Sequence, residues 1–207
     1  ELVGHHVAPD WTASGLLGMV MGKRQDAGAN VVLQEVSAHR TYLAQSGLIG
    51  APEGQSFPTH RTQWKALEGP RTLELGRDAL TVRFAAESGA VRVIKSYTFH
   101  RGRHDVEVTH EVTNLTDAPL SPALYLQLMR DGNKPEGESS LYYVYTGPAV
   151  YSDEKKFQKI EFSSIEKGKE FLVKAAPSGW IAMIQHYFVS AWVPPQGVPR
   201  EYYTLNP

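Results

Sequence analysis

The stretch Ser178–Pro195, SGWIAMIQHYFVSAWVPP, is the densest run of apolar and aromatic residues in the sequence. Burying one large apolar side chain contributes roughly 1.5 to 3 kcal/mol, so a run this dense predicts a place at the centre of the core. Gln185, His186 and Ser190 interrupt it, and it is shorter than the about 20 apolar residues that cross a bilayer. Its spacing fits both a helix and a strand, and we favour two buried strands joined by a turn or short helix near His186.

The composition is that of a folded globular protein. A chain of 207 residues can bury about 70% of its unfolded surface in one core. The net charge of −1 gives no basic footprint for nucleic acid or for an anionic membrane surface. The absence of cysteine excludes a disulfide framework, a thiolate metal site and cysteine catalysis.

The ends of the sequence do not look like natural ends. It begins at Glu1 rather than methionine and stops at Pro207 within a continuing pattern, so we interpret it as a piece of a longer protein. No signal peptide, transmembrane run or lipidation motif is present. We expect a single domain over 1–207, in which residues 1–30, broken by glycines, have no assigned structure.

From Val31 onward the sequence has the composition of short β-strands. β-branched and apolar runs alternate with turns rich in glycine, proline and acidic residues. The predicted strands are Val31–Val36, Thr41–Ile49, Arg71–Leu75, Ala79–Ala86 and Ala123–Met129.

The clearest hairpin turns at Arg101-Gly102-Arg103. On both sides of this turn, apolar residues alternate with polar ones, which predicts an antiparallel pair with one face in water. The residues of the apolar face are Val91, Val93, Tyr97, Phe99, Val106, Val108, His110 and Val112.

Short strands at turn spacings of about 8 to 12 residues predict an all-β antiparallel sandwich rather than a parallel α/β sheet. Only Ser152–Gln158 begins like a helix, with Ser152 as a possible cap and Asp153 and Glu154 in the first turn. We therefore expect one or two short helices at most.

The motifs with the strongest warrant for catalysis are missing: there is no Walker A loop, Rossmann glycine pattern, nucleophile elbow or HExxH helix. On a strand, His104 and His110 would lie about 20 Å apart, too far to share a metal. Adjacent His5 and His6 would point to opposite faces. We interpret the histidines and acids of this kind as solvated side chains; they are His5, His6, His100, His104, His110, Asp105 and Glu107.

Three further groups admit a functional interpretation. Oxygen-rich side chains in one loop resemble a calcium site but lack EF-hand spacing, so we favour a solvated loop; they are Asp131, Asn133, Glu136 and Glu138. His186 lies in the apolar run, and we favour a core histidine bonded to the backbone. A tyrosine cluster suits a sheet face or a recognition groove, and we favour packing; it comprises Tyr142, Tyr143, Tyr145 and Tyr151.

Several blocks, in the same order, resemble the large periplasmic domain of the YidC family of bacterial inner-membrane protein insertases. The blocks are 42–50 YLAQSGLIG, Lys95–His100 followed by Arg101-Gly102, 145–151 YTGPAVY, 156–160 KFQKI, 162–165 FSSI and 179–194 GWIAMIQHYFVSAWVP. The resemblance covers roughly Val31 to Asn206, and residues 1–30 fit it poorly.

The resemblance implies a β-supersandwich similar to galactose-mutarotase-like proteins, in the periplasm. It implies that the whole protein inserts and folds membrane proteins, alone or beside the SecYEG translocon with SecDF. The family's insertion chemistry is attributed to transmembrane helices that this sequence does not contain. The resemblance therefore gives no catalytic residue, no cofactor and no metal site here.

Our leading hypothesis is a non-catalytic periplasmic scaffold or docking module, with SecDF, SecYEG or nascent membrane proteins as partners and the membrane reached through flanking helices. The alternative is a carbohydrate-binding or mutarotase-like domain on the same fold, because fold does not fix function. Its acid would be His100, His110 or His186, and its base Glu107 or Glu111. A third interpretation is a folded spacer.

Overall fold

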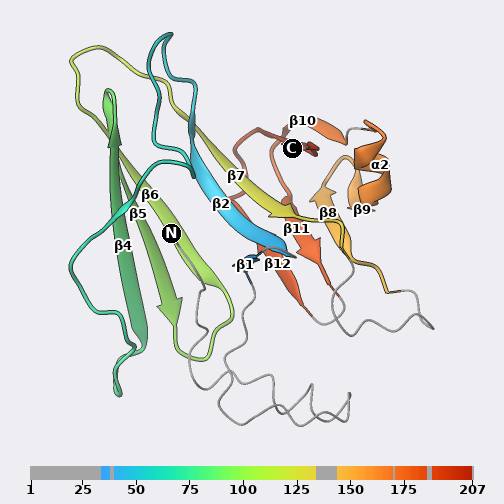
Figure 1. Ribbon diagram of the computed structural model, residues 1–207, viewed down its shortest axis with the longest axis horizontal. Coiled ribbons are helices and arrows are strands. Elements are labelled where there is room, and N and C mark those ends of the chain that lie inside the picture. Colours follow the sequence, from blue (N-terminus) through green and yellow to red (C-terminus); the bar gives the residue numbers. More distant parts are fainter. Residues whose placement is uncertain (1–33, 38–39, 134–143, 170, 186–187, 207) are drawn as a thin grey trace. The chain divides into compact units, whose positions relative to one another are not determined.

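The computed structural model describes residues 34–37, 40–133, 144–169, 171–185 and 188–206, and these are built almost wholly from antiparallel strands (Figure 1). The strands are β1 (Glu35–Val36), β2 (Thr41–Ile49), β3 (Lys65–Ala66), β4 (Ala79–Ser88), β5 (Val91–His100), β6 (Val106–Asn114), β7 (Ala123–Arg130), β8 (Gly147–Ser152), β9 (Lys156–Lys159), β10 (Leu172–Ala176), β11 (Trp180–Ile184), β12 (Val189–Trp192) and β13 (Arg200–Tyr203). The helix found in these ranges is α2 (Phe162–Glu166). The predicted all-β, antiparallel class is confirmed.

The chain divides into two compact units. In the described ranges the first unit holds residues 34–45 and 127–206, and the second holds 46–126. The boundaries fall inside β2, between Gln45 and Ser46, and inside β7, between Leu126 and Gln127. These two strands and β1 form a sheet of order β1-β2-β7. That the whole of 1–207 behaves as one domain stays a prediction.

The second unit is organised by a sheet of order β3-β4-β5-β6. The predicted hairpin is confirmed, since β5 pairs with β6 without interruption from Val91↔Asn114 to Phe99↔Val106. One face of the sheet is packed by a cluster comprising Leu48, Phe57, Ala90, Val91 and Val93, with Ala51, Trp64 and Leu120 against it.

The predicted strand Arg71–Leu75 is wrong. This segment contains no strand, and β4 pairs with β3 instead, through Lys65↔Ala85. The amide of Arg77 donates to the carbonyl of Glu74 at 3.1 Å, which closes a turn at the point where the strand would have ended. Leu75 is 99% exposed, so its apolar side chain provided a misleading strand signal.

The first unit contains the apolar run 178–195. The described residues of this run form two antiparallel strands, β11 and β12, as predicted, in a sheet of order β12-β11-β8-β9. Ala182 and Met183 are buried, but Val189 is 64% exposed on β12, which is the edge strand, and Val193, just after β12, is 67% exposed. The expectation that the whole run is interior is therefore wrong for its second half.

The face of β8 and β11 that carries Val150 and Ile181 packs into the core of the first unit. Its buried residues are Val150, Ile160, Val173, Ala176 and Tyr202, with Ile165, Phe171 and Ile181 packed against them. The strands β10 and β13 form a separate two-stranded sheet that supplies three of these side chains.

The predicted helix at Ser152–Gln158 is also wrong. Ser152 Oγ does accept a hydrogen bond from the amide of Lys155 at 3.1 Å, as an N-cap would. However, Lys156 has a φ of 56°, in the left-handed region, so the chain reverses and pairs with itself. Residues 156–159 become β9, in register with β8 through Tyr151↔Phe157.

Candidate functional site

A buried polar cluster lies on the inner face of the hairpin in the second unit. Lys95 on β5 and His110 on β6 are cross-strand partners, and both reach Ser46 on β2. Lys95 Nζ donates to the carbonyl oxygen of Ser46 at 3.1 Å and lies 4.3 Å from the ring centroid of Trp64. Ser46 Oγ lies 2.9 Å from His110 Nε2. Residues 46 and 95 are only 2% and 5% exposed, so the cluster is interior.

This environment disfavours positive charge. Burial lowers the pKa of Lys95 to about 8. Burial and the nearby charge of Lys95 lower the pKa of His110 to about 4. Within the described ranges no carboxylate lies at ion-pair distance from Lys95, so the Trp64 ring and the Ser46 carbonyl are its compensating partners. The cluster therefore places a cation in a site that favours neutral groups.

The distance from Ser46 to His110 is that of a nucleophile and its general base. However, a substrate cannot reach Ser46, so this pair cannot act in nucleophilic catalysis. A nucleophile must reach a reacting atom, and the side chain of Ser46 is enclosed by β2, β5 and β6. Among the described residues no carboxylate is bonded to His110, and the neighbouring Glu107 and Glu111 project from the opposite face of β6. We interpret the cluster as a structural network that holds β2 against the hairpin.

The His110→Gln variant should lose less stability in acid than the wild-type protein. The folded pKa of about 4 lies below the unfolded value of 6.5, so the unfolded chain binds more protons between these values and stability falls as the pH falls from 6.5 to 4. Glutamine keeps a partner for Ser46 without this titration. Urea unfolding at pH 7 and pH 4.5 should show that the wild-type loses about 2 kcal/mol more than the variant.

The exposed His104→Gln provides the matched control for the loss of a histidine outside the buried cluster. Equal losses for His110→Gln and the wild-type protein would contradict the buried, neutral state assigned to His110.

An aromatic ladder crosses three strands of the first unit. Tyr151 on β8 is paired with Trp180 on β11 and with Phe157 on β9, so the three side chains share one sheet face. The rings of Tyr151 and Trp180 are stacked, with centroids 6.0 Å apart, and the Phe157 centroid lies 5.9 Å from that of Trp180. Phe157 is 46% exposed. This face is opposite to the one that packs into the core through Val150 and Ile181.

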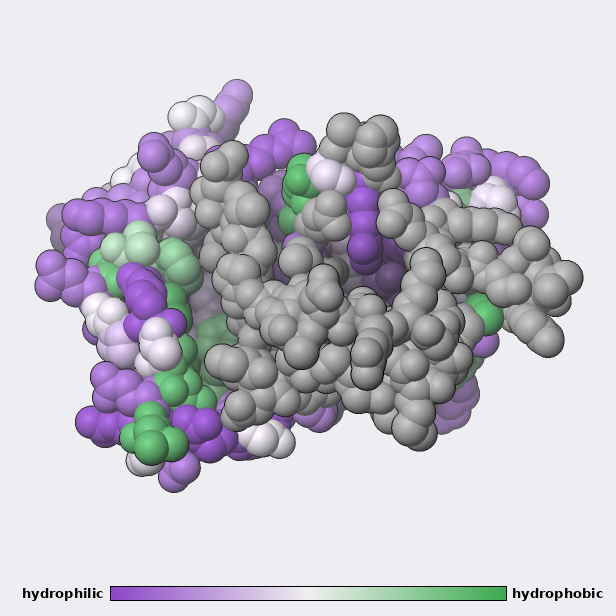
Figure 2. Space-filling view, turned by 60° about the horizontal axis from the view of Figure 1, so that its bottom comes forward, coloured by the Kyte–Doolittle hydropathy of each residue, from purple (hydrophilic) through white to green (hydrophobic). Residues whose placement is uncertain are grey.

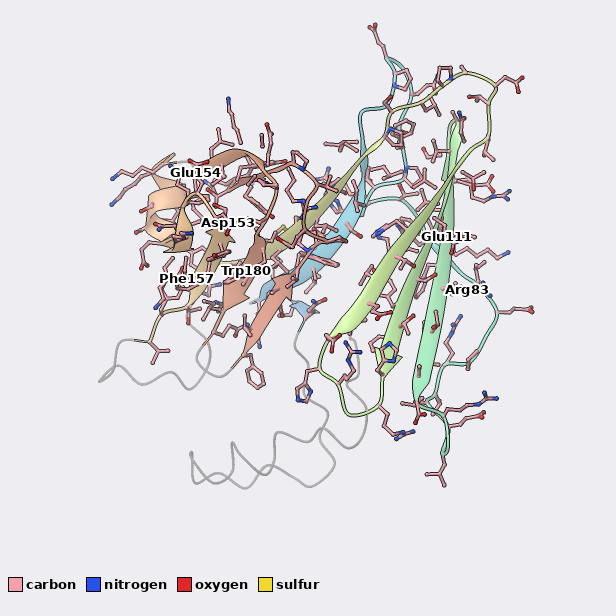
Figure 3. The ribbon with its side chains drawn as sticks, turned by 180° about the vertical axis from the view of Figure 1, so that it is seen from behind. Arg83, Glu111, Asp153, Glu154, Phe157 and Trp180 are labelled. Atoms are coloured by element: carbon pink, nitrogen blue, oxygen red, sulfur yellow. The ribbon has the colours of Figure 1, made fainter. Side chains whose placement is uncertain are left out.

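Polar groups flank this aromatic ladder. Ser178 donates to one carboxylate oxygen of Asp153, and Tyr151 donates to the other at 3.3 Å. The hydrogen bond from Ser178 is the main reason why the pKa of Asp153 is lowered. Figure 3 shows Asp153, Phe157 and Trp180 gathered on the same part of the first unit. The arrangement offers flat aromatic surface with a carboxylate beside it.

Of the histidine and glutamate combinations proposed for sugar chemistry, one is close. His100 Nε2 lies 3.7 Å from Glu107 Oε1, at the turn end of the hairpin, where the Glu107 side chain is 59% exposed. A surface pocket in the same unit has no histidine in its lining, which is Pro70, Thr72, Leu73, Glu74, Arg77, Ala79 and Leu80. His186 lies outside the described residues, as do His5 and His6.

The calcium interpretation concerns a loop that is described only up to Asn133, so Glu136 and Glu138 lie outside it. Asp131 accepts hydrogen bonds from the amides of Thr41, at 2.5 Å, and Asn133, at 2.8 Å. Burial acts to raise the pKa of Asp131, but these hydrogen bonds outweigh it and the pKa is lowered. Within the described part of the chain no three His, Asp or Glu side chains gather as a metal site would require.

The tyrosine cluster is described only in part, since Tyr142 and Tyr143 lie outside the described residues. Tyr145 is 8% exposed, and its hydroxyl accepts from the amide of Ile160 at 3.0 Å. Packing is therefore the role of Tyr145, whereas Tyr151 belongs to the aromatic ladder.

Sequence reasoning missed Lys95 and the partnership of Phe157 with Trp180. Lys95 stands between Val93 and Tyr97 on the apolar face, and a charged residue in such a series is a detectable signal of a special environment. The aromatic ladder has no local signal, because its three strands are brought together by pairing between distant segments.

The sequence of this chain is similar to known proteins over most of its length. A family model described as the YidC periplasmic domain matches residues 22–206. Relatives described as membrane protein insertase YidC include those of Bordetella petrii, 54% identical over 169 residues, Janthinobacterium sp. (strain Marseille), 51% over 179, and Cupriavidus metallidurans, 44% over 194. These matches cover 82%, 86% and 93% of this chain.

The same alignments cover 30%, 31% and 34% of the relatives, so the chain spans about a third of their length. In the described residues, no helix combines the length and apolar character needed to span a bilayer. The match extends from before β1 to the end of β13 and includes both units. The chain therefore belongs to the family of YidC periplasmic domains.

Proposed function

We propose that this chain is a non-catalytic docking module of a membrane protein insertase, and that it contacts Sec components or nascent membrane proteins through the aromatic ladder of β8, β9 and β11. The observation that carries the proposal is the Phe157–Tyr151–Trp180 ladder on a sheet face opposite to the core. Exposed aromatic side chains are frequent anchors of protein interfaces.

The physical character of the surface supports this role. Phe157 keeps nearly half of its surface in water, so a partner that covers it gains burial that the isolated chain lacks. The net charge of −1 gives little long-range steering, which suits a surface that works by short-range apolar contact. The enclosed side chain of Ser46, which is 2% exposed, supports a role without catalysis.

Site-specific photocrosslinking in the full-length protein tests the proposal. A photoreactive phenylalanine analogue at Phe157 should crosslink to SecDF, SecYEG or a nascent membrane protein at least fivefold more than the same analogue at Tyr203. Tyr203 is a matched position, because it is an aromatic residue of the same unit with 51% exposure. The Trp180→Ala variant should reduce crosslinking from residue 157. Equal yields from the two positions would remove the docking role from the aromatic ladder and leave the family membership untouched.

The carbohydrate alternative has one observation in its favour, the carboxylate of Asp153 beside the Trp180 ring system. Aromatic faces stack on sugar rings, and a carboxylate accepts their hydroxyl groups. Binding of a sugar that Trp180→Ala and Asp153→Asn both abolish would support it. Absence of crosslinks from Phe157 together with such binding would favour the alternative over docking.

A further inference from the structure

The strand β6 forms the outer edge of the sheet β3-β4-β5-β6. Its nine residues pair with β5 in unbroken register, and no other strand of the described chain pairs with them. Figure 1 shows β6 beside β5 along its whole length. A bare edge of this kind presents a row of backbone donors and acceptors to any extended chain.

The register tells which of these groups face outward. The amide of Leu115 donates to the carbonyl of Ala90, so 115 and 90 are a hydrogen-bonded pair and every second pair along the register is too. Residues 107, 109, 111 and 113 therefore bond to β5. The N–H and C=O groups of Val106, Val108, His110 and Val112 point away from it, and no hydrogen bond among the described residues takes them up.

This edge lacks the devices that usually protect one. The strand contains no proline, glycine or lysine, and its register has no bulge. Val106 and Val112 are 41% and 42% exposed along it. Figure 2 shows hydrophobic residues at the surface of the part of the chain that holds β4, β5 and β6.

The two faces of β6 define what an added strand must look like. Its inner face carries valines and His110, and its outer face carries Glu107, Thr109 and Glu111. Figure 3 shows Glu111 on β6, and within the described residues it has no ion-pair partner. Residues directly opposite one another on neighbouring strands interact, and opposite charges there are favourable.

We propose that β6 is a docking edge for an extended segment of a partner protein in which apolar residues alternate with lysine or arginine. The partner's apolar side chains would cover the inner-face valines, and its cations would lie opposite Glu107 and Glu111. Its backbone would bond to the outward groups of residues 106, 108, 110 and 112. This inference does not rest on the proposed function, because the aromatic ladder lies in the other unit and is tested by other variants.

Two labelled peptides test the inference with the full-length protein in phosphatidylcholine nanodiscs. One is a blocked nine-residue peptide in which valine alternates with lysine and threonine, and the other has glutamate in place of lysine. By fluorescence anisotropy the basic peptide should bind at least tenfold more tightly than the acidic one. Val108→Pro should weaken that binding at least tenfold, because it removes an outward donor and no hydrogen bond to β5.

The Glu111→Lys variant should reverse the preference between the two peptides. Glu53→Lys, an equal change of charge in an exposed loop of the same unit, should leave the preference unchanged. If circular dichroism shows that Val108→Pro does not fold, the Glu111→Lys variant alone tests the proposal, because the side chain of residue 111 lies on the exposed face of β6.

Three results would overturn the inference. The first is equal binding by the wild-type protein and both variants. The second is protection of the amides of 106, 108, 110 and 112 from hydrogen exchange before any peptide is added, which would mean that the edge is already occupied. The third is a dimer in sedimentation that Val108→Pro dissociates, with no peptide binding, which would identify a second copy as the occupant.

Discussion

Replacing Gly179 with alanine should lower the free energy of unfolding by about 3 kcal/mol or more. Two independent costs add. The φ of 127° lies in a region that side chains strongly disfavour. In addition, a Cβ at residue 179 would lie 2.1 Å from the carbonyl oxygen of Tyr151, which is backbone and has little freedom to move. Equilibrium urea unfolding measures the change.

The backbone at Gly179 is held on both sides, so a shift that relieved the overlap would cost further free energy. Its amide donates to Oε1 of Gln196 at 2.7 Å, and β11 begins at the next residue, with Trp180 paired to Tyr151. Moving the glycine would disturb this pair and, with it, the aromatic ladder. Alanine here is therefore expected to weaken crosslinking from Phe157 as well as stability.

Gly197 provides the control for strain without overlap. Its φ is 90°, but no atom lies within 4 Å of the point that an added Cβ would occupy, so Gly197→Ala should cost only about 1 kcal/mol. Similar losses for the two variants would show that the contact with Tyr151 is not the dominant cost at Gly179.

Replacing Lys95 with methionine should stabilise the protein at pH 7 and should no longer stabilise it at pH 10. A pKa lowered from 10.5 to about 8 corresponds to a cost of about 3 kcal/mol for holding the buried cation at neutral pH. Methionine fills similar volume without charge. The lost contacts with Trp64 and the Ser46 carbonyl offset part of the gain, so we expect a net gain of about 1 to 2 kcal/mol at pH 7.

The pH dependence has a definite sign. Because the folded pKa lies below the unfolded one, the unfolded chain binds more protons between pH 8 and 10.5, and the stability of the wild-type protein rises through this window. The advantage of Lys95→Met should therefore shrink by about 2 kcal/mol from pH 7 to pH 10. The exposed Lys65→Met serves as control for the loss of a lysine outside the buried cluster. A constant difference for Lys95→Met would refute the buried-cation account.

The parts of the fold that could be predicted from sequence are those set by local alternation. The β5–β6 hairpin follows from apolar and polar residues alternating on both sides of Arg101-Gly102-Arg103, and the structure confirms the antiparallel pair. β2 was predicted at its observed bounds because residues 41–49 are rich in β-branched and apolar side chains. At the start of β5 the observed burial follows the alternation, since Val91 and Val93 are buried and Arg92 is exposed.

The errors arise where the same local chemistry serves two structures. Ser152 accepts a hydrogen bond from an amide three residues ahead both in a helix and in the observed turn. The turn differs from a helix in the left-handed conformation of Lys156, and because this residue is not a glycine, the sequence does not indicate it. The exposure of Val189 depends on β12 being an edge, which is a property of strand order rather than of residues 189–192. The aromatic ladder and the Lys95 cluster likewise depend on pairing between segments far apart in the chain.

The path of the chain through the two units has a consequence for the order in which they can form. Among the described residues the second unit is one continuous stretch, 46–126, whereas the first is assembled from residues on both sides of it. When the polypeptide emerges from its amino end, 46–126 is complete long before β13, which pairs with β10 to finish the first unit. The stretch 46–126 can therefore fold early, whereas the half of β2 up to Gln45 has partners that are translated more than eighty residues later. A chain truncated after residue 130 and released from the ribosome should contain one folded unit and one unfolded.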